Sequence, residues 1–265
     1  MFADLALAKR LERAEGYACM RFAAARRRLF PESGSEWLET GGAYVVFDGV
    51  ESPVTQSFGL GLFEPLSAER LREVERFFFE RGAPAMLEIS PFAGVPAIDL
   101  LCGRGYRPVE ISNVMWQSIE DSGAETANVR VIGPGESVLW NDVSARGWCH
   151  EHPELAEYFR QSGAISTARE GSVCFLAEVD GQPGAAGSLC LHDGVALLAG
   201  ASTVPELRRR GLQGALLRER LRYAYRVGCD LAMMVAEVGS ESQRNAERKG
   251  FRIAYTRTKW CLRKS

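Results

Sequence analysis

The chain has 265 residues, with 32 Lys and Arg against 34 Asp and Glu, a formal net charge of −2 and a pI near 6.0. This length allows two ordinary domains with real cores, and the charge argues against a general nucleic-acid binder, which needs a sustained basic face. No apolar run approaches membrane-spanning length and the first ten residues lack a signal core, so we expect a cytoplasmic protein with no membrane partner.

Cysteine and histidine spacing argues against disulfides and bound metal. The seven cysteines are odd in number and include no C-x-x-C pair, and several lie in apolar runs where a thiol acts as a small hydrophobe. His150 and His152 form a His-x-His pair, but no third ligand of matching character is evident. We therefore expect reduced core thiols and no metal.

The first half alternates helical and strand patterns. Apolar spacing, breakers and a good N-cap at Ser67 predict the order of elements. The predicted elements are one or two helices over 5–29, strands over 43–47 and 56–62, a helix over 67–81, a strand over 85–90, a helix over 95–102 and a strand over 109–117. This order indicates an α/β fold.

A short, small and polar segment, 121–128, favours a domain boundary, so we predict domains over 1–125 and 126–265. In the second half, Asp180-Gly181 and Asp193-Gly194 lie between apolar runs and predict hairpins. The predicted elements are strands over 129–132, 172–179, 186–192, 195–201, 230–237 and 252–262, and helices over 136–148, 154–162, 212–227 and 243–249. The middle strands form an antiparallel meander.

The two halves repeat each other. A Gly-aromatic-Arg segment occurs at 105–107 and again at 250–252, with its glycines 250 − 105 = 145 residues apart, and Trp116 or Trp260 follows. A repeat of this length indicates duplicated domains. The alternative is a chance likeness between strand–helix pairs.

The segment over 203–217 joins a strand end to a helix start. Pro205 removes a strand donor, while Gly211 and Gly214 let the backbone approach a ligand closely. The helix start has unpaired N–H groups beside Arg208, Arg209 and Arg210, which favours a phosphate-bearing ligand. The alternative is a basic turn on a solvated helix end.

The spacing fits neither a P-loop nor a dinucleotide fold. Instead it resembles the pyrophosphate loop of the GCN5-related N-acetyltransferases, Gln/Arg-x-x-Gly-x-Gly/Ala, with Gln213 in place of the last small residue. The resemblance implies that loop amides hold the coenzyme A pyrophosphate and that the preceding strand end pairs with the pantetheine arm. The implied acetyl-CoA contacts are Thr203, Val204, Arg208, Arg209, Arg210, Gly211, Leu212, Gln213, Gly214 and Ala215, with Asn245 as a further polar contact.

The resemblance also predicts the fold: two acyl-CoA N-acyltransferase-like domains, each a mixed, mostly antiparallel sheet flanked by helices. The first half has the element order but lacks the loop. Phe-Glu-Pro-Leu stands at 63–66, so Glu64 places negative charge where pyrophosphate would lie. We interpret the first half as a degenerate copy.

The implied chemistry is direct attack of an amine on the thioester. The resemblance makes the Val204 N–H the donor to the acetyl carbonyl, and it places Ala246 where many members have a tyrosine acid. Tyr255 is the substitute acid and Glu237 the candidate base. The structural alternatives are a solvated strand-end carboxylate for Glu237 and a surface amide for Asn245.

The predicted function is acetyl transfer from acetyl-CoA to an amine. The sequence does not specify the acceptor, which is a small amine or a protein amine, or the oligomeric state. A non-catalytic acyl-CoA-binding or scaffolding protein is the alternative, favoured by the missing tyrosine. A nucleotide-binding module ranks third.

Overall fold

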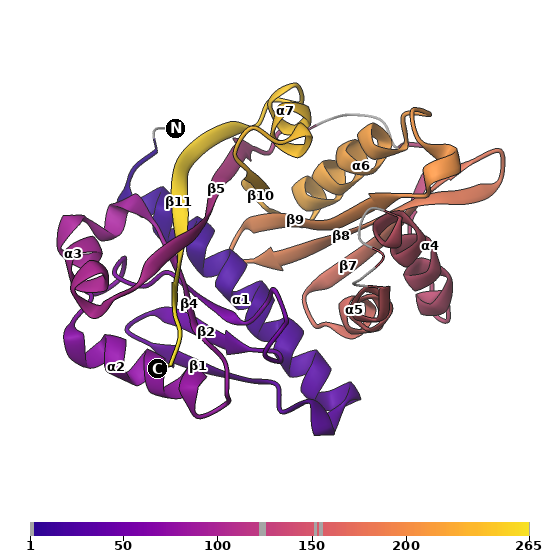
Figure 1. Cartoon of the computed structure of the whole chain (residues 1–265). Coiled ribbons are helices and arrows are strands. Elements are labelled where there is room, and N and C mark those ends of the chain that lie inside the picture. Colours follow the sequence, from indigo (N-terminus) through magenta and orange to yellow (C-terminus); the bar gives the residue numbers. More distant parts are fainter. Residues whose placement is uncertain (1–2, 122–125, 151–152, 154–155, 265) are drawn as a thin grey trace. The chain divides into compact units, whose positions relative to one another are not determined.

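The structure is a computed structural model that describes residues 3–121, 126–150, 153 and 156–264 (Figure 1). The chain forms two compact units. The first unit combines Met1–Gln117 with Met233–Ser265, and the second unit is Ser118–Ala232. The last strands of the chain therefore fold with its N-terminal part.

The first unit contains a mixed sheet with strand order β1-β2-β3-β4-β11-β5-β10. Strands β3 and β4 are parallel, whereas the pairs β1–β2, β2–β3, β4–β11 and β11–β5 are antiparallel. Its elements are α1 (Leu5–Leu29), β1 (Glu36–Thr40), β2 (Ala43–Phe47), β3 (Gln56–Phe58), α2 (Ala68–Phe79), β4 (Ala85–Ile89), α3 (Val95–Arg104), β5 (Arg107–Ser118), β10 (Leu231–Glu237), α7 (Glu241–Glu247) and β11 (Arg252–Leu262).

Helices cover both faces of this sheet at β2, which is buried along its whole length. On one face Val45 packs into a cluster with residues of α2 and α3, including Leu71 and Leu101. On the other face α1 approaches closely because Gly16 has no side chain: a Cβ there would lie 2.8 Å from Tyr44 Cδ2. Burial on both faces explains why β2 is a continuous apolar run instead of an alternating one.

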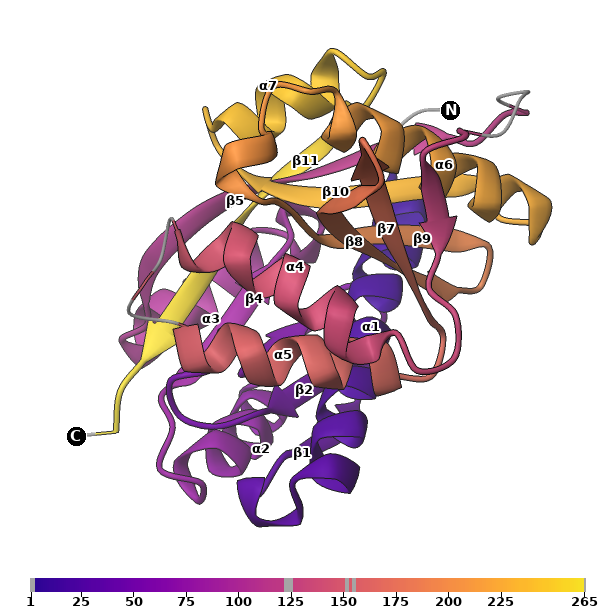
Figure 2. The same ribbon diagram turned by 90° about the vertical axis from the view of Figure 1, so that its right-hand side faces the viewer.

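The second unit is an antiparallel sheet of order β9-β8-β7-β6 with helices on opposite faces. Leu176 packs with Trp140 of α4, while the neighbouring Phe175 contacts the Tyr223 ring of α6, as the alternation of a strand requires. Figure 2 shows α4 and α5 side by side. The elements are β6 (Val129–Val131), α4 (Ser137–Cys149), α5 (Ala156–Ala168), β7 (Ser172–Val179), β8 (Gln182–His192), β9 (Val195–Thr203) and α6 (Leu212–Arg226).

The predicted fold class is confirmed, and so are most of the element types. Both Asp-Gly turns have positive φ at each residue, as a tight hairpin turn requires, and Ser67 caps α2 by accepting from the Arg70 N–H at 3.1 Å. In the second half, α5 extends to Ala168 and β8 begins at Gln182, beyond their predicted bounds. In the first half, two strands differ from the prediction. Strand β1 was missed, and β3 ends at Phe58 instead of residue 62 because Gly59 turns the backbone with a φ of 80°.

The predicted domain division at residue 125 stays a prediction. Within the part of the chain that the structure describes, no helix combines the length and apolarity needed to cross a membrane.

Candidate functional site

The predicted loop has the local structure that its sequence suggests. β9 ends at Thr203, a short 3-10 turn covers Pro205–Leu207, and α6 begins at Leu212. The backbone turns into the helix through left-handed conformations, with φ of 61° at Arg209 and 79° at Gly211. Glycine takes this conformation without the cost that a Cβ adds.

The N-terminus of α6 has no side-chain cap. Gly211 is the N-cap residue and cannot supply an acceptor, and the first helical bond runs from the Ala215 N–H to the Gly211 carbonyl at 3.0 Å. The N–H groups of residues 212–214 therefore have no acceptor within the helix. A Cβ placed on Gly211 would meet no heavy atom of the described residues within 4 Å, so the space beside the N-cap position is open.

The three arginines of the loop have different roles. Arg208 folds back, donating to the Thr203 carbonyl and to the Gly147 carbonyl near the end of α4, each at 3.4 Å. Arg210 forms an exposed ion pair with Asp180 at 2.8 Å, which contributes little to stability. Arg209 is exposed and pairs with no carboxylate among the described residues. Among the described residues, Arg209 is therefore the loop arginine without a carboxylate partner.

The remaining predicted loop residues anchor the helix start. The Gln213 side chain donates to Thr203 Oγ1 at 2.7 Å, which ties the first turn of α6 to the end of β9. Leu212 and Ala215 are buried, so they can offer only backbone to a ligand, and Gly214 lies half-buried in the first turns of the helix.

The prediction that the Val204 N–H serves an acetyl carbonyl is wrong. That N–H donates to the Gly184 carbonyl of β8 at 2.9 Å, so it belongs to the sheet ladder. Neighbouring residues of an antiparallel strand turn their polar backbone groups to opposite sides. Thr203, paired with Ala185, therefore turns its N–H away from β8. Sequence alone could not decide this because it depends on the register.

A cavity of about 310 Å³ lies beside the strand end, between α4, the start of β8 and the 3-10 turn. Leu139, Val143, Pro183 and Leu207 supply apolar lining. Val204 and Glu206, at the strand end and in the turn, also line it.

The predicted catalytic residues and Asn245 lie in the first unit, whereas the loop lies in the second. Glu237 is the last residue of β10 and is exposed. Asn245 is exposed on α7, next to the buried Ala246.

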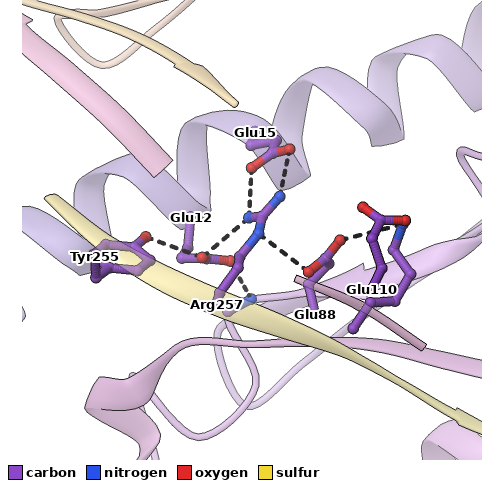
Figure 3. Close-up of polar contacts among 8 residues, drawn as sticks. Glu12, Glu15, Glu88, Glu110, Tyr255 and Arg257 are labelled. Carbon is purple, nitrogen blue, oxygen red and sulfur yellow. Dashed lines mark hydrogen bonds and ion pairs between the residues drawn. The ribbon is translucent and has the colours of Figure 1, made fainter. Parts of the chain in front are cut away.

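Tyr255 is buried on β11, with 6% of its surface exposed, and donates its hydroxyl to Glu12 Oε1 at 3.0 Å (Figure 3). Burial, together with the Glu12 charge, raises the pKa of Tyr255 well above its ordinary value. A phenol that holds its proton this tightly is a poor general acid.

Tyr255 belongs to a buried charge cluster that sequence analysis missed. The Arg257 guanidinium of β11 contacts Glu12 at 3.1 Å and Glu15 at 2.7 Å on α1, and Glu88 of β4 at 3.1 Å. Figure 3 shows the carboxylates converging on this guanidinium. Glu12 and Arg257 are 245 residues apart, so no local pattern predicts their pairing.

In the first half, the polar groups near the equivalent helix start bond to other groups of the chain, whereas the start of α6 has no side-chain cap. The N–H of Gly59, just after β3, donates to Glu12 Oε2 at 3.2 Å, and the N-terminus of α2 is capped by Ser67. Glu64, although exposed, pairs with Arg70 at 3.2 Å. The contrast with the uncapped α6 follows directly from the sequences Phe-Glu-Pro-Leu-Ser and Arg-Arg-Gly.

No protein-family model and no curated protein matches the sequence of this chain. Solved structures are similar to it in fold. A GCN5-related N-acetyltransferase from Kribbella flavida has a TM-score of 0.61 and 18% identity, with coverage of 94% of this chain and 96% of that one. One from Sphaerobacter thermophilus has a TM-score of 0.54 and 15% identity, covering 92% and 89%.

A tandem GNAT protein from the clavulanic acid biosynthesis pathway matches over 99% of this chain and 96% of its own, with a TM-score of 0.57 and 13% identity. The likeness therefore extends through both halves. The chain has the GCN5-related N-acetyltransferase fold, in the tandem arrangement that this neighbour also has.

Proposed function

We propose that this chain is an acetyl-CoA-dependent N-acetyltransferase whose C-terminal domain, 126–265, binds the donor, and whose N-terminal domain, 1–125, is a degenerate copy. The observation that carries the proposal is the contrast between the two equivalent helix starts. The start of α6 has open space at Gly211, no side-chain cap, and an Arg209 that pairs with no carboxylate of the described residues. The start of α2 is capped by its own Ser67.

In this proposal the pyrophosphate binds at the start of α6. The N–H groups of residues 212–214 donate to its oxygens, and the positive end of the helix dipole adds to the attraction. Arg209 and Arg210 supply positive charge, the latter by exchanging its exposed Asp180 partner for phosphate. Arg208 acts by holding the loop against β9.

The pantetheine arm then runs past the end of β9, at Thr203 and Val204. Because the arm leads away from the loop, the thioester lies further up the strand, toward Gly200. Three residues of strand span about 10 Å at roughly 3.3 Å per residue. Gly200 is exposed in mid-strand while Leu198 and Ser202 are buried, which leaves room for the acyl group there.

The reaction joins the amine nitrogen to the acetyl carbonyl carbon and breaks the C–S bond. The amine loses a proton to a base, and coenzyme A leaves as a thiolate that takes up a proton. Glu237 remains the proposed base because it is an exposed carboxylate at a strand end. The proposal of Tyr255 as acid is weaker, because its hydroxyl is buried against Glu12; water can protonate the thiolate, since a thiol has a pKa of about 8.5.

A non-catalytic acyl-CoA-binding protein is the second candidate. The buried state of Tyr255 and the alanine at position 246 favour it, because neither offers an acid to the leaving sulfur. Thioester turnover separates the two: an enzyme releases free coenzyme A faster when the right amine is added, and a binding protein does not.

The loop assignment is tested by substituting a carboxylate into it. Gly211→Glu should abolish acetyl-CoA binding in titration calorimetry, because it places bulk and negative charge in front of the α6 donors. Gly228→Glu is the matched control, since Gly228 also has open surroundings and a similar φ, 85° against 79°. Both substitutions force a side chain into the left-handed region at a cost of roughly 1–2 kcal/mol.

Loss of binding in Gly211→Glu alone supports the site. Equal affinity in the two folded variants would place the ligand elsewhere and remove the basis of the proposed function.

A further inference from the structure

The cavity between α4, the start of β8 and the 3-10 turn has no role in the proposed function. Its volume of about 310 Å³ is that of a smaller small-molecule pocket. All of its lining residues belong to the second unit, so the cavity is formed within that unit alone. A cavity of this size within one unit is a candidate ligand site.

Apolar side chains from three segments form its walls. Leu139 and Val143 are four residues apart on α4, so they lie on the same face of the helix. Val143 and Val204 are buried, whereas Leu139 is 38% exposed. Leu207 reaches the start of β8 because Gly184 has no side chain: a Cβ there would lie 2.7 Å from Leu207 Cδ1. The walls are therefore buried on one side and open to solvent on the other.

Three charged side chains also line the cavity. Arg146 Nη1 lies 3.9 Å from Asp142 Oδ2, and Arg146 Nη2 lies 3.8 Å from Glu206 Oε2. Both distances are longer than a hydrogen bond. The side chains of Arg146, Asp142 and Glu206 are 54%, 61% and 73% exposed, so these ion pairs contribute little to stability. Both carboxylates therefore keep lone pairs for a stronger donor.

The charges of the lining favour a cation over an anion. Two carboxylates against one guanidinium give a formal charge of 1 − 2 = −1, and the remaining polar residue, Gln182, is neutral. The neighbouring loop arginines are engaged elsewhere. Arg208 donates to two backbone carbonyls, and Arg210 pairs with Asp180.

We propose that this cavity binds a small organic amine. The apolar body of the ligand lies between α4 and the 3-10 turn, and its ammonium group donates to Asp142 and Glu206. An ammonium group has enough N–H donors for both carboxylates, and charge-assisted hydrogen bonds are roughly twice as strong as neutral ones. The site is independent of the proposed function, because the ligand contacts neither the start of α6 nor an acyl group.

Three probes of similar size test the charge preference: 2-phenylethylamine, 2-phenylethanol and 3-phenylpropionate. Titrations followed by ¹H–¹⁵N NMR of the labelled protein, without acyl-CoA, give the Kd of each probe and show which backbone N–H groups shift. We expect saturable binding of the amine with shifts at Val204 and Leu207. The alcohol should bind more weakly, and the carboxylate should not bind.

Asp142→Asn combined with Glu206→Gln removes both negative charges and keeps the size of the side chains. This variant should weaken binding of the amine by about tenfold or more and leave the Kd of the alcohol unchanged. Asp99→Asn combined with Glu69→Gln is the matched control, because it removes the same charge from exposed positions on α3 and α2. The control should bind the amine like the wild-type protein.

Leu139→Trp fills the cavity and should weaken binding of the amine and the alcohol alike. Leu29→Trp is its matched control, since Leu29 lies at the end of α1 with a similar exposure, 41% against 38%. The control should bind both probes unchanged. Because Leu139 and Leu29 are both partly exposed, the larger side chain is compatible with folding at each position.

Saturable binding of the amine that both cavity variants weaken, and that both controls keep, supports the site. The proposal is overturned if the amine does not saturate, if the carboxylate binds as tightly as the amine, or if the folded cavity variants bind like wild type. Sedimentation velocity tests a different occupant, a second copy of the chain: a wild-type dimer that Leu139→Trp dissociates would also overturn the proposal. None of these results depends on acetyl-CoA binding, so the amine site and the proposed function can fail separately.

Discussion

Removing the guanidinium of Arg257 should strongly destabilise the first unit. Arg257 is 2% exposed and contacts Glu12, Glu15 and Glu88. Arg257→Met keeps a side chain of similar length but leaves these carboxylates without their main counter-charge. Breaking a buried ion pair by removing one partner costs roughly 3–5 kcal/mol, which is a large fraction of the stability of an ordinary domain.

The stability lost in Arg257→Met should depend on pH in a defined direction. Burial raises the pKa of Glu88 from 4.5 to about 6, and the charges of Arg257 and Lys259 oppose that rise. Because this carboxyl binds its proton more tightly in the folded state, its contribution to the free energy of unfolding falls by about 2 kcal/mol as pH rises from 4.5 to 6. Without Arg257 the pKa values of Glu12 and Glu88 rise further, so the variant loses more stability at pH 8 than at pH 5.

Urea denaturation followed by far-UV circular dichroism at pH 5 and pH 8 measures both effects. Arg160→Met is the control, since Arg160 forms an exposed ion pair with Glu157, and it should change the free energy of unfolding by less than about 1 kcal/mol. The assignment of a charged buried cluster would be refuted if Arg257→Met lowered the free energy of unfolding as little as the control does, or by the same amount at the two pH values.

Three further predictions follow from the structure. Gly16→Ala should lower the free energy of unfolding by roughly 1–3 kcal/mol through overpacking against the sheet, whereas Gly103→Ala, in open space on α3, should be neutral or slightly stabilising. The same urea denaturation checks both, and similar free energies of unfolding in the two variants would contradict the close approach of α1 to the sheet. Glu64→Ala should leave the acetyl-CoA Kd unchanged in calorimetry, and a clear loss would mean that the first half takes part in binding. Iodoacetamide at pH 8 should alkylate the exposed Cys102 but not Cys174, whose pKa burial raises to about 12; mass spectrometry of the peptides decides, and rapid labelling of Cys174 would show that its strand opens.

Local chemistry made much of this fold predictable from sequence. The Asp-Gly turns, the Ser67 cap and the Gly211 helix start each depend on one or two neighbouring residues, so their structures follow from composition and spacing. The loop was identified for the same reason, because its glycine and arginines are contiguous.

The features that sequence missed depend on contacts between distant segments. The sequence around Glu12 is typical of a helix whose charged face is solvated. Only the insertion of β11 between β4 and β5 brings Arg257 to Glu12. The direction of the Val204 N–H depends on the register of β8 and β9, which a bulge between Ala186 and Ser188 shifts. In each case the local pattern is the same for a buried and an exposed residue.

The central claim is that one acetyl-CoA binds per chain, at the loop before α6. Titration calorimetry of the purified protein with acetyl-CoA, with ADP and dephospho-CoA as comparison ligands, tests it most directly. The account predicts one site per chain with a preference for acetyl-CoA over both comparison ligands. No binding, or equal affinity for ADP and acetyl-CoA, would contradict it, because the loop would then be a basic turn or a simple phosphate site.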